Sequence, residues 1–171
     1  MTRNGQPLSQ DDRKRRAPLW VALADLFLDT EMQVEHYAAV RQAALTGGFA
    51  AAEVKAILLG EVMPVFGFNA IDIAGEWAGF EPEWAAERVS DYLAGKVVAG
   101  KLPALALVLV RRSLLRYEWP RLARILAGED IERAMAAEPP PLTASNSGLK
   151  RFLWWTVPIL LAVLLFMIVK R

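Results

Sequence analysis

Residues 74–84, AGEWAGFEPEW, place three glutamates among two tryptophans and a phenylalanine. A carboxylate beside aromatic rings can have a raised pKa, because an apolar environment disfavours its charged form, and such groups serve as general acids. Under this interpretation the chain would be a carboxylate-dependent enzyme that uses Glu76 or Glu81.

The alternative interpretation of the same stretch is the start of a helix. Pro82 suits a first helical turn, and Glu81 and Glu83 would lie at the positive end of the helix dipole. We favour this alternative, with both tryptophans, Trp77 and Trp84, as core anchors. Glu76 then has no local role, and we predict a buried ion pair between it and one of three arginines: Arg16, Arg41 or Arg88.

A second acidic stretch, LADLFLDTE at 23–31, carries Asp25, Asp29 and Glu31. Asp25 and Asp29 are four residues apart and would share one helix face, as ligands of a divalent cation could. The commoner explanation is that Asp29 ends one helix near the start of the next. We favour this explanation, and we expect no metal and no cofactor.

Other catalytic chemistry has little support in the sequence. The chain has no cysteine, which excludes cysteine nucleophiles and thiolate metal sites, and His36 is its one histidine. Phosphate-binding glycine loops and the Gly-x-Ser-x-Gly motif are absent from the sequence. Enzymes are therefore disfavoured as a class.

Apolar residues recur at three- and four-residue steps almost throughout residues 10–136, which predicts an all-α fold. Ser9 with Asp12, and Thr30 with Gln33, resemble capping boxes, and Gly47 and Gly48 resemble a helix stop. The expected helices are about 10–28, 31–45, 50–63 ending at Pro64, 82–93, 101–126 with a boundary at Trp119 before Pro120, and 129–137.

Charge is segregated along the chain. Residues 17–100 hold twelve acidic and four basic side chains, whereas residues 101–128 hold six basic and one acidic. An acidic domain argues against nucleic acid as a ligand, because phosphate binding needs a continuous cationic surface. It favours a basic protein partner, and the candidate partner-binding residues are Asp29, Glu31, Glu35 and Glu76.

Residues 101–126 allow two interpretations. An apolar stripe flanked by arginines is typical of a helix that lies on anionic lipid. The apolar run LPALALVLV instead favours a core helix that places its arginines against the acidic residues of 17–100. The candidate lipid-facing residues are Arg112, Arg116, Arg121, Arg124, Trp154 and Trp155.

Residues 152–169, FLWWTVPILLAVLLFMIV, contain no charge and are flanked by basic pairs on both sides. At 1.5 Å per residue a helix here spans roughly 27 Å, about the hydrocarbon thickness of a bilayer. With no signal peptide at the N-terminus, we expect a single-pass tail anchor in the bacterial inner membrane and a cytoplasmic domain. The expected organisation is a basic arm (1–9), a helical domain (10–136), a Pro/Ser-rich tether (137–149) and a tail anchor (150–171).

Three segments, LADLFLDTE, EVMPVFGFN at 61–69 and AGEWAGFEPEW, resemble a family of small uncharacterised bacterial helical domains. The resemblance covers about residues 10–95 and implies a compact helical bundle. It implies no activity, cofactor or catalytic residue. Residues 101–171 look like an addition to this family.

These observations together indicate a tail-anchored protein whose acidic helical domain binds another protein. An immunity or adaptor protein of a toxin, secretion or membrane complex would fit this size and charge. The alternative functions are binding or remodelling of anionic lipid through residues 101–126 and, more remotely, carboxylate-dependent catalysis.

Overall fold

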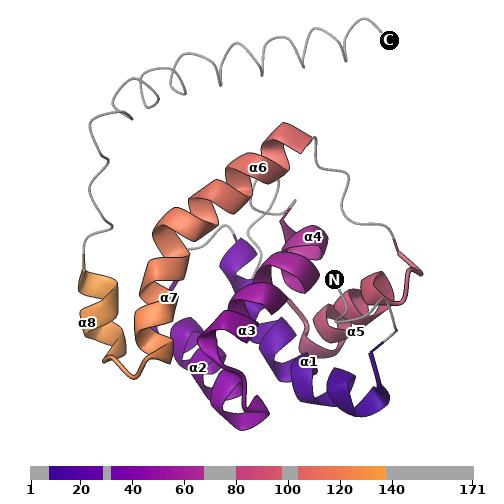
Figure 1. Ribbon diagram of the computed structural model, residues 1–171, viewed down its shortest axis with the longest axis horizontal. Coiled ribbons are helices and arrows are strands. Elements are labelled where there is room, and N and C mark those ends of the chain that lie inside the picture. Colours follow the sequence, from indigo (N-terminus) through magenta and orange to yellow (C-terminus); the bar gives the residue numbers. More distant parts are fainter. Residues whose placement is uncertain (1–7, 29–31, 68–79, 98–103, 138–171) are drawn as a thin grey trace, which may run out of the picture. The chain divides into compact units, whose positions relative to one another are not determined.

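The structure is a computed structural model that describes residues 8–28, 32–67, 80–97 and 104–137. These residues form helices and contain no strand, which confirms the all-α fold class (Figure 1). Contacts divide the chain into two units, Met1–Ala137 and Glu138–Arg171. Every helix below belongs to the first unit.

The first helix, α1 (Gln10–Ala24), begins at Ser9, whose hydroxyl oxygen accepts a hydrogen bond from the Asp12 N–H at 3.1 Å. This confirms the expected N-terminal cap. The helix ends before residue 28, because the chain tightens into a 3₁₀ turn, η1 (Asp25–Phe27). It packs against α2 (Val34–Gly47) and α5 (Pro82–Leu93).

Helix α2 begins at Gln33, so the expected start near residue 31 is wrong. The Gln33 N–H donates a hydrogen bond to Nδ1 of His36 at 3.0 Å, and the histidine thus caps the helix. Gly48 ends α2 with a φ of +65°, in the left-handed region that glycine adopts without strain. Thr30 lies outside the described residues.

The next helical stretch runs without a break through α3 (Ala51–Ile57), η2 (Leu58–Val62) and α4 (Met63–Phe66). The expected end at Pro64 is therefore wrong. A proline lacks an N–H and its ring clashes with a carbonyl of the preceding turn. The η2 segment is a π turn in which the Met63 N–H donates to the Leu58 carbonyl, and this wider turn accommodates Pro64 within the helix.

The same arrangement recurs near the end of the domain, where α6 (Ala104–Ser113), η3 (Leu114–Glu118) and α7 (Trp119–Leu126) are continuous. In the π turn η3 the Trp119 N–H donates to the Leu114 carbonyl, and Pro120 follows. The helix therefore continues through the boundary expected at Trp119. The last helix, α8 (Ile131–Ala136), is capped by the Asp130 carboxylate.

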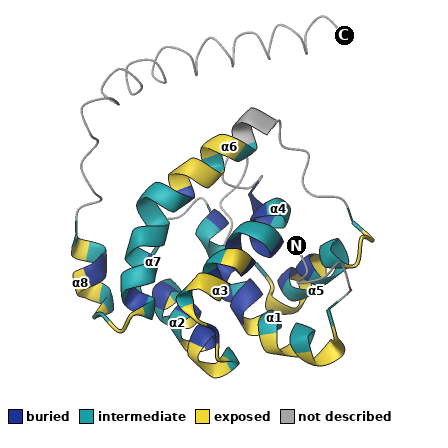
Figure 2. Cartoon of the chain, viewed as in Figure 1, coloured by how far each residue is buried: buried dark blue, intermediate teal, exposed yellow. Residues whose placement is uncertain are grey.

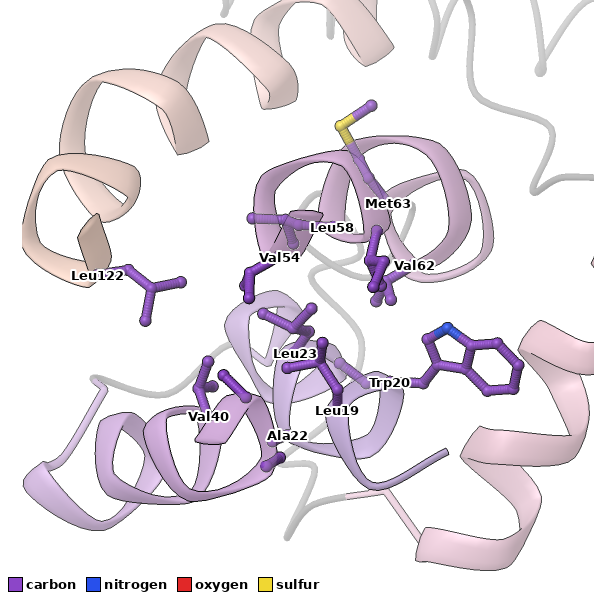
Figure 3. Packing of buried hydrophobic residues seen from close by; sticks show 14 of the residues in the cluster. Leu19, Trp20, Ala22, Leu23, Val40, Val54, Leu58, Val62, Met63 and Leu122 are labelled. Carbon is purple, nitrogen blue, oxygen red and sulfur yellow. The ribbon is translucent and has the colours of Figure 1, made fainter. Parts of the chain in front are cut away.

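The core is assembled by helices from both ends of the domain. The largest fully buried side chains include Trp20 from α1, Tyr37 from α2 and Leu122 from α7. Figure 3 shows Leu122 pointing toward the cluster that contains Val40 and Val54. Helix α7 packs against α2 and α3, so the C-terminal basic segment is part of the same core.

The predicted tail anchor lies outside the residues that the structure describes. Within the described residues, every helix is too short or too polar to cross a bilayer. Residues 152–169, most of the expected tether and most of the basic arm lie outside those residues.

Candidate functional site

The glutamates of residues 74–84 differ in what the structure shows of them. Glu81 is the N-cap of α5, and its carboxylate accepts hydrogen bonds from the N–H groups of Glu83 and Trp84, the latter at 2.7 Å. Hydrogen bonding with Glu83 and with the Trp84 N–H lowers the pKa of Glu81. A general acid at neutral pH needs a raised pKa, so Glu81 is a helix cap. Glu76 lies outside the described residues.

Trp84 lies on the surface, so its expected place in the core is wrong. The side chain is 48% exposed. Its ring stacks on Phe80 at a centroid distance of 5.9 Å and meets the edge of buried Phe66 at the same distance. The indole is therefore held by an aromatic platform while a large part of it faces solvent. Trp77 lies outside the described residues.

Three exposed carboxylates lie close to Trp84 along the chain. Glu81, Glu83 and Glu87 are all exposed, and Glu83 and Glu87 share one face of α5 at the four-residue spacing. Arg88 is the one basic side chain within α5. Figure 2 shows that α5 carries both exposed and buried residues. We call Glu81, Glu83, Trp84 and Glu87 the Trp84 surface.

The buried carboxylate of the domain is Glu61, which sequence reasoning missed. Glu61 is 7% exposed and is the one buried charged or polar residue among those the structure describes. Its carboxylate accepts a hydrogen bond from Trp20 Nε1 at 2.7 Å and one from the Arg16 guanidinium. Arg16, one of the partners predicted for Glu76, thus pairs with Glu61.

A signal for Glu61 was present in the sequence. It stands in the same three- and four-residue periodicity as Val54, Ile57 and Leu58, all of which are buried. An acid on an apolar helix face requires a donor or a cation when it is buried. The helix periodicity therefore indicates a buried acid at position 61. Its partners, Arg16 and Trp20, lie on α1.

Burial shifts the pKa of this carboxylate. Desolvation raises the pKa of Glu61, and the hydrogen bond from Trp20 and the charge of Arg16 oppose the rise. The folded state therefore binds the proton more tightly than the unfolded chain does. The contribution of Glu61 to the free energy of unfolding is therefore fully present below the ordinary glutamate pKa. It is lost as pH rises through the pKa that Glu61 has in the folded state.

Glu61→Gln should remove this pH dependence, because glutamine does not ionise. The test is the urea midpoint of both full-length proteins in detergent, followed across the acidic range above the ordinary glutamate pKa. The wild-type midpoint should fall relative to that of the variant as pH rises. A wild-type midpoint that rises relative to the variant would contradict the raised pKa.

A second carboxylate occupies the other π turn. Glu118 in η3 accepts a hydrogen bond from the Tyr37 hydroxyl at 2.6 Å, and Arg121 lies 3.8 Å from it. Burial, with the neighbouring Glu118, raises the pKa of Tyr37. Both π turns thus present an acid to an aromatic donor on α1 or α2. We interpret these contacts as ties between helices, because each carboxylate is occupied by protein donors.

Of the remaining acidic candidates, the structure describes Asp25 and Glu35, which lie on different elements. Asp29 and Glu31 lie outside the described residues, and Glu35 is exposed on the first turn of α2. Asp25 is half-buried, and desolvation raises its pKa while His36 opposes the rise. Within the described ranges, no group of three or more acidic or histidine side chains could hold a metal ion.

The four candidate lipid-facing arginines differ in exposure. Arg112 is exposed on α6, whereas Arg116 and Arg121 each bury an Nε atom that has no hydrogen-bond partner among the described residues. Arg124 pairs with Glu129. The ion pairs of Arg121 and Arg124 are thus local, whereas we expected partners within residues 17–100. Trp154 and Trp155 lie outside the described residues.

The comparisons with known proteins extend the family assignment. The model of a domain of unknown function, DUF7079, matches residues 14–125. No curated protein and no solved structure matches the chain. The family match reaches residue 125, so the expectation that the family ends near residue 95 is wrong. Residues 101–125 are part of the family domain, in keeping with the buried side chains of α7. The chain therefore belongs to the DUF7079 family of domains of unknown function.

Proposed function

We propose that this protein is a membrane-anchored binding protein. Its helical domain holds a basic segment of a protein partner at the Trp84 surface, and residues 152–169 attach the domain to the bacterial inner membrane. The observation that carries the binding proposal is the exposure of Trp84, 48%, on an aromatic platform.

Tryptophan is among the residues that contribute most to binding energy at protein interfaces. Trp84 rests on Phe80 and Phe66, so little conformational freedom remains to be lost when a partner covers it. The carboxylates of Glu83 and Glu87 favour a partner with lysine or arginine beside its apolar contact. This combination supports a basic, partly apolar segment as the ligand.

The membrane part of the proposal is supported by the sequence of residues 152–169, eighteen uncharged positions between basic pairs. Within this class, an immunity or adaptor protein that holds a toxin or a subunit of a membrane complex is the specific role that we propose. Such a protein needs a binding surface and an anchor, and it needs no reaction centre.

Co-purification of the full-length protein from native membranes in mild detergent tests the proposal. Trp84→Ala should weaken retention of a specific partner roughly 30-fold, the effect of losing an interface hot spot. Glu83→Lys with Glu87→Lys should weaken it too, and more strongly at low salt, because exposed charges are screened at high salt.

Leu45→Ala is the matched control, because Leu45 is 66% exposed on α2 and lies outside the Trp84 surface. A partner retained equally by all of these variants would contradict the assignment of the Trp84 surface. The charge-reversal variant distinguishes a loss of binding from a loss of folding, because Glu83 and Glu87 are exposed and support no core packing.

A further inference from the structure

Helix α6 presents apolar and basic side chains to solvent together. Val108 is 59% exposed and Leu109 is 41% exposed. Arg111 and Arg112, which follow after Val110, are exposed too. Figure 2 shows exposed residues along α6. Arg112 lies one turn beyond Val108, so the two share a face of the helix. We call these four residues the α6 face.

The inner side of the same helix is already occupied. Leu107 and Val110 pack against the core, and Leu114 at the start of η3 is buried. The exposure of Val108 and Leu109 is therefore not explained by the packing of the domain. Two neighbouring apolar side chains followed by two arginines match the chemistry of an anionic lipid surface, into which apolar groups insert while guanidinium groups reach the headgroups.

The expected tail anchor would bring such a surface within reach. Residues 138–151 can extend at most about 50 Å. The continuous helix from Ala104 to Leu126 is about 35 Å long, so the tether can accommodate a domain whose α6 face touches the bilayer. Charge complementarity and the anchor in the same chain favour lipid over a symmetric pairing of two α6 faces, which would bring arginine against arginine.

We infer that the α6 face, Val108, Leu109, Arg111 and Arg112, lies on the anionic surface of the membrane that holds the anchor. This inference rests on the membrane attachment in the proposed function, and it leaves the Trp84 surface for the protein partner. Each arginine near an anionic surface strengthens the contact about fivefold, so the pair contributes roughly 25-fold.

Site-directed spin labelling of the full-length protein tests the inference. The chain has no cysteine, so Val108→Cys provides a unique labelling position and Leu45→Cys provides an exposed control. Both proteins are reconstituted in vesicles of phosphatidylglycerol with phosphatidylcholine, and in phosphatidylcholine alone. Flotation reports attachment, and accessibility to oxygen and to a water-soluble nickel chelate reports depth.

In the anionic vesicles the label at 108 should be accessible to oxygen and shielded from nickel, and the label at 45 should stay accessible to nickel. Arg111→Glu with Arg112→Glu should return the label at 108 to water while the protein still floats. A floating protein with an aqueous label at 108 overturns the inference and leaves the anchor intact.

Three further results would also overturn the inference. A label at 108 shielded equally in neutral vesicles would remove the role of anionic lipid. A label shielded from oxygen as well as nickel would indicate a protein contact, such as a second copy. Failure of the protein to float would overturn this inference together with the membrane part of the proposed function.

Discussion

Glu61→Leu is expected to lower the free energy of unfolding by about 3 kcal/mol, the lower end of the range for breaking a buried ion pair. The substitution removes the acceptor of two donors, Trp20 Nε1 and the Arg16 guanidinium, which share the Glu61 carboxylate in the wild-type protein. Trp20 is 1% exposed, so water cannot replace its acceptor. The Arg16 side chain is 21% exposed, and this access to solvent moderates the loss.

Urea unfolding of the full-length protein in detergent, followed by circular dichroism, measures this effect. Glu61→Gln keeps an acceptor oxygen for Trp20, so it should lose no more than about 1 kcal/mol. Glu87→Leu, at an exposed position of α5, should change stability by less than about 0.5 kcal/mol. Equal losses of unfolding free energy in Glu61→Leu and Glu61→Gln would show that the donors left without an acceptor are not the cause.

Leu122→Ala is expected to lower the free energy of unfolding by about 3–5 kcal/mol. Leu122 is 0% exposed, and its side chain points into the core cluster from α7 (Figure 3). Truncation removes buried methyl groups and leaves a cavity among side chains held by three different helices. Because α7 packs against α2 and α3, the whole domain should lose stability in one transition.

The matched control is Leu109→Ala, the same truncation at a 41% exposed position of α6. It should change stability by less than about 1 kcal/mol. A separate, early transition in the Leu122→Ala protein would contradict a single cooperative domain, because it would mean that α6 to α8 unfold by themselves.

Sequence reasoning succeeded where local chemistry decides the structure. Ser9 begins α1, Gly48 ends α2, and Glu81 with Pro82 begins α5, as expected. In each case the deciding interaction lies within three residues of the helix end. The all-α class followed for the same reason, because helical periodicity is a local property of the sequence.

The two π turns could not be predicted from local sequence chemistry. A proline predicts a helix end, yet the helices continue past Pro64 and Pro120. Residues beyond each proline, Phe66 and Leu122, are buried in the core. The burial of Phe66 and Leu122 favours continuation of each helix. A π turn makes this continuation compatible with the N–H that proline lacks. Tertiary packing therefore overrode the local preference.

The site residues required distant partners and so could be predicted only in part. Glu61 is 41 residues from Trp20 and 45 from Arg16. Arg16 was one of three arginines predicted as partners of Glu76, which lies outside the described residues, and it pairs with Glu61. Trp84 was assigned to the core because tryptophan is usually buried, and its exposure depends on how α5 lies on α4. Neither arrangement follows from spacing along the chain.

Photo-cross-linking from position 84 in living cells tests most directly whether the Trp84 surface binds a basic segment of another protein. A photoreactive phenylalanine analogue replaces Trp84 in one full-length protein and Leu45 in another, at two exposed apolar positions on different helices. If the Trp84 surface does bind such a segment, position 84 should give a discrete adduct that maps to a lysine- or arginine-rich segment and is lost on Glu83→Lys with Glu87→Lys. Position 45 should give no such adduct. No adduct from position 84, or the same adducts from both positions, would show that the Trp84 surface does not bind such a segment.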